Sequence, residues 1–220
     1  MNVVRILIAA LMLAGCSSMP VIQPASGPER AQNTVCPEVF VKESTRFIHA
    51  IEARSAGRTQ AVMIGVTFPE PKTRSVSCAV VSPEGLSLFE AASRGGEVHV
   101  ARALPPFDAP DFAANMMADI ELIFLAPQGI PAGRGVLSDG RAVCRWHPEK
   151  GGWVDVSRDA KGQSRIERYT EGGRLKRAVT FAAGPGSPYS AIELQASDLI
   201  SYSLTMTLIE SEAVTEETKN

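Results

Sequence analysis

The sequence lacks the features that identify three large classes of protein. Its 220 residues carry 22 Lys and Arg against 24 Asp and Glu, a formal net charge of −2. This balance excludes a strongly basic nucleic-acid binder and an acidic, solvating chain. After the first fifteen residues no apolar run reaches the length of about 18 that a membrane-spanning helix needs, so no internal transmembrane helix is expected.

Recognisable catalytic motifs are also missing. The sequence contains no Gly-x-Ser-x-Gly elbow, no His-Glu-x-x-His, no phosphate-binding loop and no dinucleotide fingerprint. The histidines His49, His99 and His147 are far apart in the chain, and we expect His49 and His99 on the solvent faces of strands rather than at a metal. The sequence therefore predicts a protein that is not an enzyme and that needs no cofactor.

Residues 1–15 have the form of a secretory signal peptide. One positive charge precedes the apolar segment Ile6–Leu13, which is too short to span a bilayer as a helix. The segment ends in Leu13-Ala14-Gly15-Cys16, which resembles the bacterial lipobox. The resemblance implies that Cys16 becomes the first mature residue and carries acyl chains such as palmitate. Each buried methylene contributes about 0.8 kcal/mol, so several chains would anchor the protein firmly.

Ser17 follows Cys16, at the position where an aspartate would imply retention in the inner membrane. The resemblance therefore implies a periplasm-facing protein of the outer membrane.

The flanks of the mature chain are expected to be unstructured. Residues 16–35 contain three prolines and mostly polar residues, which predicts a flexible, solvated tether. Residues 212–220 form an acidic tail, with fraying expected from Glu210 onward. A domain over 36–211 remains.

This domain is predicted to be mainly β, because 18 Gly and 15 Pro separate short segments of strand composition. Such spacing is typical of an antiparallel barrel or sandwich. The last segment alternates strictly, with Ile200, Tyr202, Leu204, Met206 and Leu208 on one face. The expected strands are 46–52, 60–68, 74–82, 86–92, 97–103, 141–146, 152–156, 164–169, 175–181, 189–195 and 199–209.

One segment has a helical period. Asp108 and Pro110 predict its start, and Pro127 predicts its end. The next stretch, with Gly133 and Gly135, is expected to be flexible. The apolar stripe of this helix comprises Phe112, Met116, Ile120 and Ile123, with Ala113, Met117 and Phe124 beside it.

Several charged residues are interpreted as solvated. Asp119 and Glu121 lie on the polar side of the predicted helix. Glu167, Arg168 and Glu171 are interpreted as surface charges on a hairpin. None of them is expected to take part in chemistry.

The cysteines and tryptophans leave alternatives open. In an oxidising periplasm Cys36 could pair with Cys78 or Cys144, and the equal alternative is three buried thiols. Trp146 and Trp153 flank a turn, where we expect a packed cross-strand cluster rather than a binding patch.

The order of lipobox, tether, five-strand meander, apolar helix and further strands is similar to that of the lipoprotein carrier LolA and its receptor LolB. The resemblance implies a curved, incomplete antiparallel barrel of about eleven strands, with a helix covering its concave face. The residues that carry the likeness are Gly65-Val66, the hairpin Val81–Phe89, Ile166–Tyr169, Ile192–Leu194 and Tyr202–Leu204.

The resemblance also implies a hydrophobic cavity between sheet and helix that holds the acyl chains of a client. Phe112, Met116, Met117 and Ile120 are the candidate lining residues, and methionine suits an adaptable apolar pocket. The receptor carries an apolar residue on a protruding loop, for which Leu86 is the candidate, although its turn is short. The carrier has a cavity arginine that latches its lid helix, and no arginine of this sequence is matched to it.

These observations predict an outer-membrane lipoprotein that binds the acyl chains of a lipid or lipoprotein, as carrier or acceptor. Its expected partners are the acylated client, the membrane through the lipid anchor, and a periplasmic carrier protein, without nucleic acid. The alternative is a membrane-tethered interaction module of the cell envelope, in which the apolar stripe of the helix only fills the core.

Overall fold

The structure, a computed structural model, describes residues 19–24, 35–184, 187–197 and 201–214. Cys16, Ile200 and the tail beyond Val214 lie outside the described residues. The chain forms one 12-stranded antiparallel sheet in the order β5-β4-β3-β2-β1-β12-β11-β10-β9-β8-β7-β6, accompanied by the helix α3. The sheet remains open, with β5 and β6 at its two edges. The predicted fold class, an incomplete antiparallel barrel with one covering helix, is therefore confirmed.

Eleven of the strands fall on the predicted segments, with ends that differ by a few residues, and β6 is additional. Their bounds are β1 (Thr45–Ser55), β2 (Arg58–Glu70), β3 (Ser75–Val81), β4 (Ser87–Arg94), β5 (Glu97–Ala103), β6 (Gly133–Val136), β7 (Ala142–Trp146), β8 (Trp153–Arg158), β9 (Ser164–Tyr169), β10 (Leu175–Gly184), β11 (Ser187–Ser197) and β12 (Ser201–Ala213).

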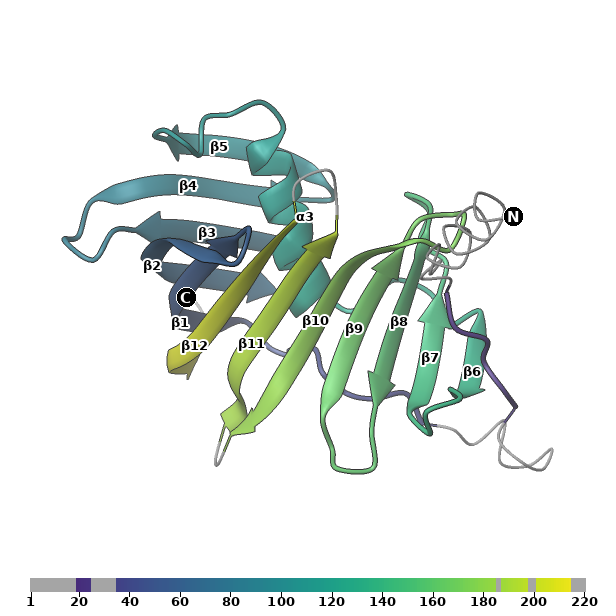
Figure 1. Cartoon of the computed structure of the whole chain (residues 1–220). Coiled ribbons are helices and arrows are strands. Elements are labelled where there is room, and N and C mark those ends of the chain that lie inside the picture. The colour runs from purple at the N-terminus through teal and green to yellow at the C-terminus, as the bar shows by residue number, and fades with distance from the viewer. Residues whose placement is uncertain (1–18, 25–34, 185–186, 198–200, 215–220) are drawn as a thin grey trace, which may run out of the picture.

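The sheet consists of two meanders that meet in the middle. Strands β1 to β5 pair in chain order, β6 to β12 do the same, and β1 pairs with β12 to join the two halves. The helix α3 (Phe112–Phe124) connects the two edge strands and therefore crosses one face of the curved sheet, as Figure 1 shows. We call the face that contacts α3 the inner face, and the opposite one the outer face.

The helix begins and ends close to the predicted signals. Asp111, directly before the first helical residue, has a left-handed backbone with φ of 60°, so the chain turns there rather than at Pro110. Leu125 is extended, and Pro127 prevents the helix from resuming.

The strand β6 was not predicted, because its two glycines were interpreted as flexibility. Gly135 pairs with Val143, and a Cβ at Gly135 would overlap the backbone carbonyl of Gln23. Gln23 and Val136 exchange two backbone hydrogen bonds of 2.9 Å. The glycine therefore permits a close approach of two backbones, a requirement that arises only in the folded chain.

Residues 19–24 lie across the outer face, and we call them the N-terminal strap. The backbone N–H of Met19 donates to the carbonyl of Gly173 at 2.8 Å, and the carbonyl of Pro20 accepts a hydrogen bond of 2.8 Å from Arg145. Figure 1 shows the strap in dark purple beside β6 and β7. The prediction of a solvated tether is wrong for these residues, because strand edges and polar side chains give their backbone partners.

The outer face of β7 to β9 carries buried charges. Arg145 and Asp155 form a two-pronged ion pair with hydrogen bonds of 2.6 Å each, beneath the N-terminal strap. Glu167, which we had interpreted as a surface charge, is 6% exposed and accepts a hydrogen bond from Arg141 at 3.3 Å. That prediction is wrong because the register places Glu167 opposite Asp155.

The two tryptophans do not form the expected cluster. Trp146 packs in the core and lies opposite Val154 in β8. Trp153 directly precedes Val154, and successive side chains of a strand point to opposite faces, so Trp153 lies on the other face of the sheet. The Trp153 ring contacts His147 instead, with ring centroids 4.4 Å apart. The strand register, rather than proximity in the sequence, decides which aromatic side chains meet.

The acidic end of β12 is ordered further than expected. Glu210 and Glu212 each accept a hydrogen bond from Arg46 in β1, at 2.6 and 2.7 Å. The prediction that the chain frays from Glu210 is therefore wrong, because β1 supplies both the backbone partners and the opposite charge.

Candidate functional site

The inner face holds two hydrophobic clusters that meet at α3. The second half of the helix packs with the inner residues of β1 and β7 to β12. The first half packs with those of β3, β4 and β5. Ile120 contacts both clusters and thereby links the two halves of the sheet. The helix therefore packs against both halves of the sheet.

The structure brings together four of the five predicted ligand-binding residues. Met117 is fully buried, and its sulfur accepts a hydrogen bond of 3.5 Å from the Cys78 thiol. Phe112, Met116 and Ile120 pack around it but stay half-buried. Leu86 lies in the β3–β4 turn, 54% exposed, and belongs to neither cluster. Met117 is thus core, whereas its three neighbours also face solvent.

An apolar surface continues from these residues onto the middle of the sheet. Ile51 lies opposite Met63 in β2, and Ala53 lies opposite both Ala61 and Leu204. All five are half-buried, although most inner side chains of the flanking strands are buried. We call the following set the inner apolar patch: Ile51, Ala53, Ala61, Met63, Met116, Ile120 and Leu204.

A buried polar contact fixes the helix beside this patch. Arg177 in β10 donates from Nε to the Asp119 carboxylate at 2.7 Å, and the hydroxyl of Tyr202 in β12 donates to the same carboxylate at 2.5 Å. The Arg177 guanidinium also lies over the Tyr202 ring, 5.7 Å from its centroid. Two strands therefore hold Asp119 of the helix, β10 through Arg177 and β12 through Tyr202. The stacking of Arg177 on the Tyr202 ring links these two partners to each other.

The prediction that Asp119 and Glu121 are solvated is wrong. Asp119 is 7% exposed, and Glu121 accepts a hydrogen bond from Ser93. The sequence did hold a signal for Asp119, because it lies three residues after Met116 and four before Ile123, at the edge of the apolar stripe. Its partner could not be found from the sequence, because Arg177 is 58 residues away.

His49 was expected on a solvent face, and this prediction is also wrong. The side chain is 1% exposed and lies within hydrogen-bond distance of the Tyr189 hydroxyl, 3.1 Å from Nε2. Burial lowers the pKa of His49 to about 4 and raises that of Tyr189. The sequence held a signal for this burial, because His49 lies two residues from Phe47 and two from Ile51. Residues two apart in a strand lie on the same face, and both of these face inward.

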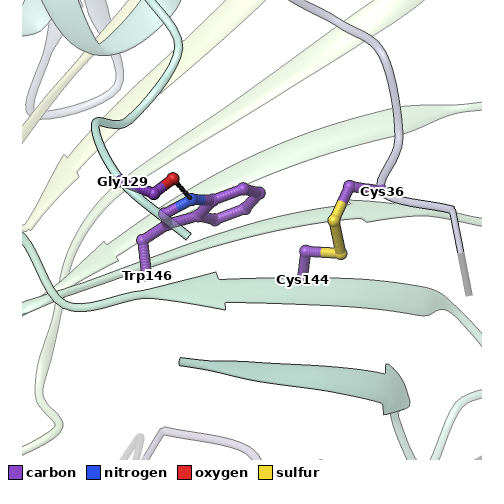
Figure 2. Close-up of a disulfide and its surroundings, with 4 residues drawn as sticks. All are labelled: Cys36, Gly129, Cys144 and Trp146. Carbon is purple, nitrogen blue, oxygen red and sulfur yellow. Dashed lines mark hydrogen bonds between the residues drawn. A yellow bond between two sulfur atoms is a disulfide. The ribbon is translucent and has the colours of Figure 1, made fainter. Parts of the chain in front are cut away.

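A disulfide joins Cys36 to Cys144 in β7, which decides between the alternatives left open by the sequence. Figure 2 shows the bridge beside Trp146, whose indole N–H donates to the carbonyl of Gly129 at 3.3 Å. Cys78 remains a buried free thiol, and its burial raises the thiol pKa to about 12. The disulfide thus fixes the segment that precedes β1 against the inner face.

Two cavities open on the inner side. The first, of about 580 Å³, lies beside the disulfide and Trp146. The second, of about 330 Å³, lies between the exposed side of α3 and the turns of β7–β8 and β9–β10. Neither is lined by Phe112, Met116, Met117 or Ile120. Among the described residues, no group of side chains has the composition and spacing of a metal site, and no helix has the length and apolarity to cross a membrane.

No protein-family model and no curated protein matches this sequence. Among solved structures, a LolA superfamily protein from Nitrosomonas europaea aligns with a TM-score of 0.53 and 11% identity, over 81% of this chain and 90% of that one. A domain described as an outer membrane lipoprotein-sorting protein, from Vibrio parahaemolyticus, aligns with a TM-score of 0.48 and 12% identity, over 81% and 88%. The first alignment spans most of both chains, and this protein therefore has the fold of a LolA superfamily protein.

Proposed function

We propose that this protein is a non-enzymatic lipoprotein of the outer membrane that binds acyl chains of a lipid or lipoprotein on its inner apolar patch, as carrier or acceptor. The observation that carries the proposal is the patch itself. Its side chains lie on the inner face of an open sheet, beside a helix, and remain half-buried where a filled core would cover them. Apolar surface of this kind favours an apolar occupant.

The composition of the patch fits flexible chains. Met63 and Met116 adapt their shape to different occupants, and Ala53 and Ala61 leave space where larger side chains would fill it. Displacing water from this surface contributes about 25 cal/mol per Å² of apolar area, so a long acyl chain gains several kcal/mol. The ion pair between Asp119 and Arg177 sets the position of α3 beside the occupant.

The lipidation of Cys16 and the location in the outer membrane rest on the lipobox and on Ser17. The fold likeness to a LolA superfamily protein agrees with a role in the cell envelope. A periplasmic carrier protein would deliver the client if this protein is the acceptor.

The experiment uses the full mature chain with Cys16→Ser, purified from the periplasm without detergent. Native mass spectrometry should show a bound acylated molecule, which is then extracted and identified. Ala61→Trp should abolish retention by filling the patch. Val62→Trp is the matched control, because Val62 is the next residue, faces outward and is 55% exposed. A protein that carries no ligand and takes up no fatty acid or lipopeptide would contradict the proposal and favour an interaction module.

A further inference from the structure

The cavity of about 330 Å³ lies at one rim of the sheet and has a cationic lining; we call it the rim cavity. Four cationic side chains line it against two carboxylates, an excess of two positive charges. A threonine hydroxyl and an asparagine amide add neutral donors. The charged residues are Lys150, Arg168, Lys176 and Arg177 against Asp119 and Glu171.

Both carboxylates already have partners. Asp119 accepts hydrogen bonds from Arg177 and Tyr202. Glu171 accepts from the backbone N–H of Gly152 at 2.7 Å and lies 3.1 Å from His147.

Among the residues that the structure describes, two of these cations stand without a carboxylate partner. Within the described part of the chain, neither Lys150 nor Arg168 forms an ion pair. Arg168 is also half-buried. Burial has removed part of the water around this guanidinium, and no carboxylate of the described ranges replaces that water. Binding of an anion is therefore favourable at Arg168.

The rim cavity lies where the two halves of the sheet approach each other. Lys150 belongs to the β7–β8 turn, yet its ammonium lies directly against Gly96 in the β4–β5 turn, where a Cβ would overlap it. Lys150 therefore reaches across the opening between the halves. Together with Arg168 it presents charge to a group that enters from the rim.

The N-terminal strap begins at the same rim. Met19 is hydrogen-bonded to Gly173, in the β9–β10 turn that also supplies Thr170 and Glu171 to the rim cavity. Cys16 precedes Met19 by three residues, which span at most about 11 Å when extended. If Cys16 is lipidated, a step that rests on the proposed function, this rim lies next to the membrane surface.

We propose that the rim cavity binds a phosphate group, and that its source is the headgroup of a membrane lipid. Arg168 and Lys150 are the primary contacts, since arginine suits the forked geometry of phosphate oxygens and lysine supplies a mobile charge. The bound headgroup orients the open inner face relative to the bilayer. Inorganic phosphate shares the chemistry and is the other source that the experiment must separate.

The experiment measures sedimentation of the full mature chain carrying Cys16→Ser with phosphatidylcholine vesicles, with and without phosphatidylglycerol. Lys150→Gln combined with Arg168→Gln should reduce binding to the phosphatidylglycerol vesicles by about tenfold or more. Arg58→Gln combined with Lys72→Gln removes the same charge from exposed positions elsewhere and should leave binding nearly unchanged. Native mass spectrometry of the same variants reports acyl-chain retention separately, so failure of this proposal is distinguishable from failure of the proposed function.

Two results of the vesicle experiment would overturn the proposal. Equal losses in both double variants would mean general attraction of charge to the surface, and no loss in the first would mean that the cavity is not used. A second experiment measures the binding of inorganic phosphate and of glycerol phosphate by titration calorimetry. Binding of these ions without any binding to vesicles would overturn the membrane source.

Discussion

Asp119 in the helix and Arg177 in β10 form an ion pair of 2.7 Å between two side chains that are each 7% exposed. The pair joins α3 to β10 beside the half-buried inner apolar patch. A carboxylate and a guanidinium that are both removed from water stabilise each other, and breaking such a buried pair by removing one partner is strongly destabilising.

Replacing Asp119 with Asn should lower the free energy of unfolding by about 3 kcal/mol, because the substitution breaks the buried ion pair with Arg177. Urea denaturation followed by circular dichroism measures this loss. Asp108→Asn is the matched control on the exposed approach to the helix and should change stability by less than about 0.5 kcal/mol. Equal effects of the two substitutions would mean that the ion pair does not hold the helix.

Acidification should destabilise the protein through His49. Its pKa is about 4 in the fold against an ordinary value of 6.5, since burial disfavours the charged ring. As the pH falls below 6.5 the unfolded chain binds this proton and the folded chain does not, so stability is lost down to pH 4 and then levels off. The loss is roughly 3 kcal/mol at most.

Urea denaturation across this pH range measures the effect, and His49→Gln should flatten it. His99→Gln serves as the control, because His99 is exposed on β5. An unchanged pH profile in His49→Gln would show that other groups cause the acid sensitivity.

Reduction should destabilise the fold through the Cys36–Cys144 disulfide, which closes a loop across a sequence separation of 108. The expected loss is roughly 2–4 kcal/mol, because the reduced chain gains entropy when unfolded. Melting temperatures with and without dithiothreitol measure it in a Cys16→Ser background. Cys78→Ala should keep the response to reductant, whereas Cys36→Ala with Cys144→Ala should remove it. A response that depends on Cys78 would contradict the observed pairing.

Gly135→Ala should detach the N-terminal strap from β6, because the added Cβ would overlap the carbonyl of Gln23. Hydrogen exchange of residues 19–24 should then accelerate while the core strands stay protected. Gly133→Ala is the control, since its Cβ would meet only Ile22 at an ordinary contact of 3.4 Å. Equal protection of the strap in both variants would mean that it does not depend on this close approach.

The sequence alone determined much of this protein. Strand composition between Gly and Pro turn signals located eleven of the strands, with strict alternation in the last one, and the apolar stripe with its prolines located the helix. These features are local, because the periodicity of a segment reports which of its faces is buried. The lipobox likewise predicts an anchor without reference to the fold.

Only the tertiary structure decided which distant residues meet. The partner of Asp119 lies 58 residues away. Cys36 pairs with Cys144 rather than Cys78 because of the path taken by the chain before β1. Gly135 was interpreted as flexible, although it is required for contact with Gln23. In each case the role of the residue depends on sheet register and on the curvature that brings remote strands together, and neither is encoded within a short window of sequence.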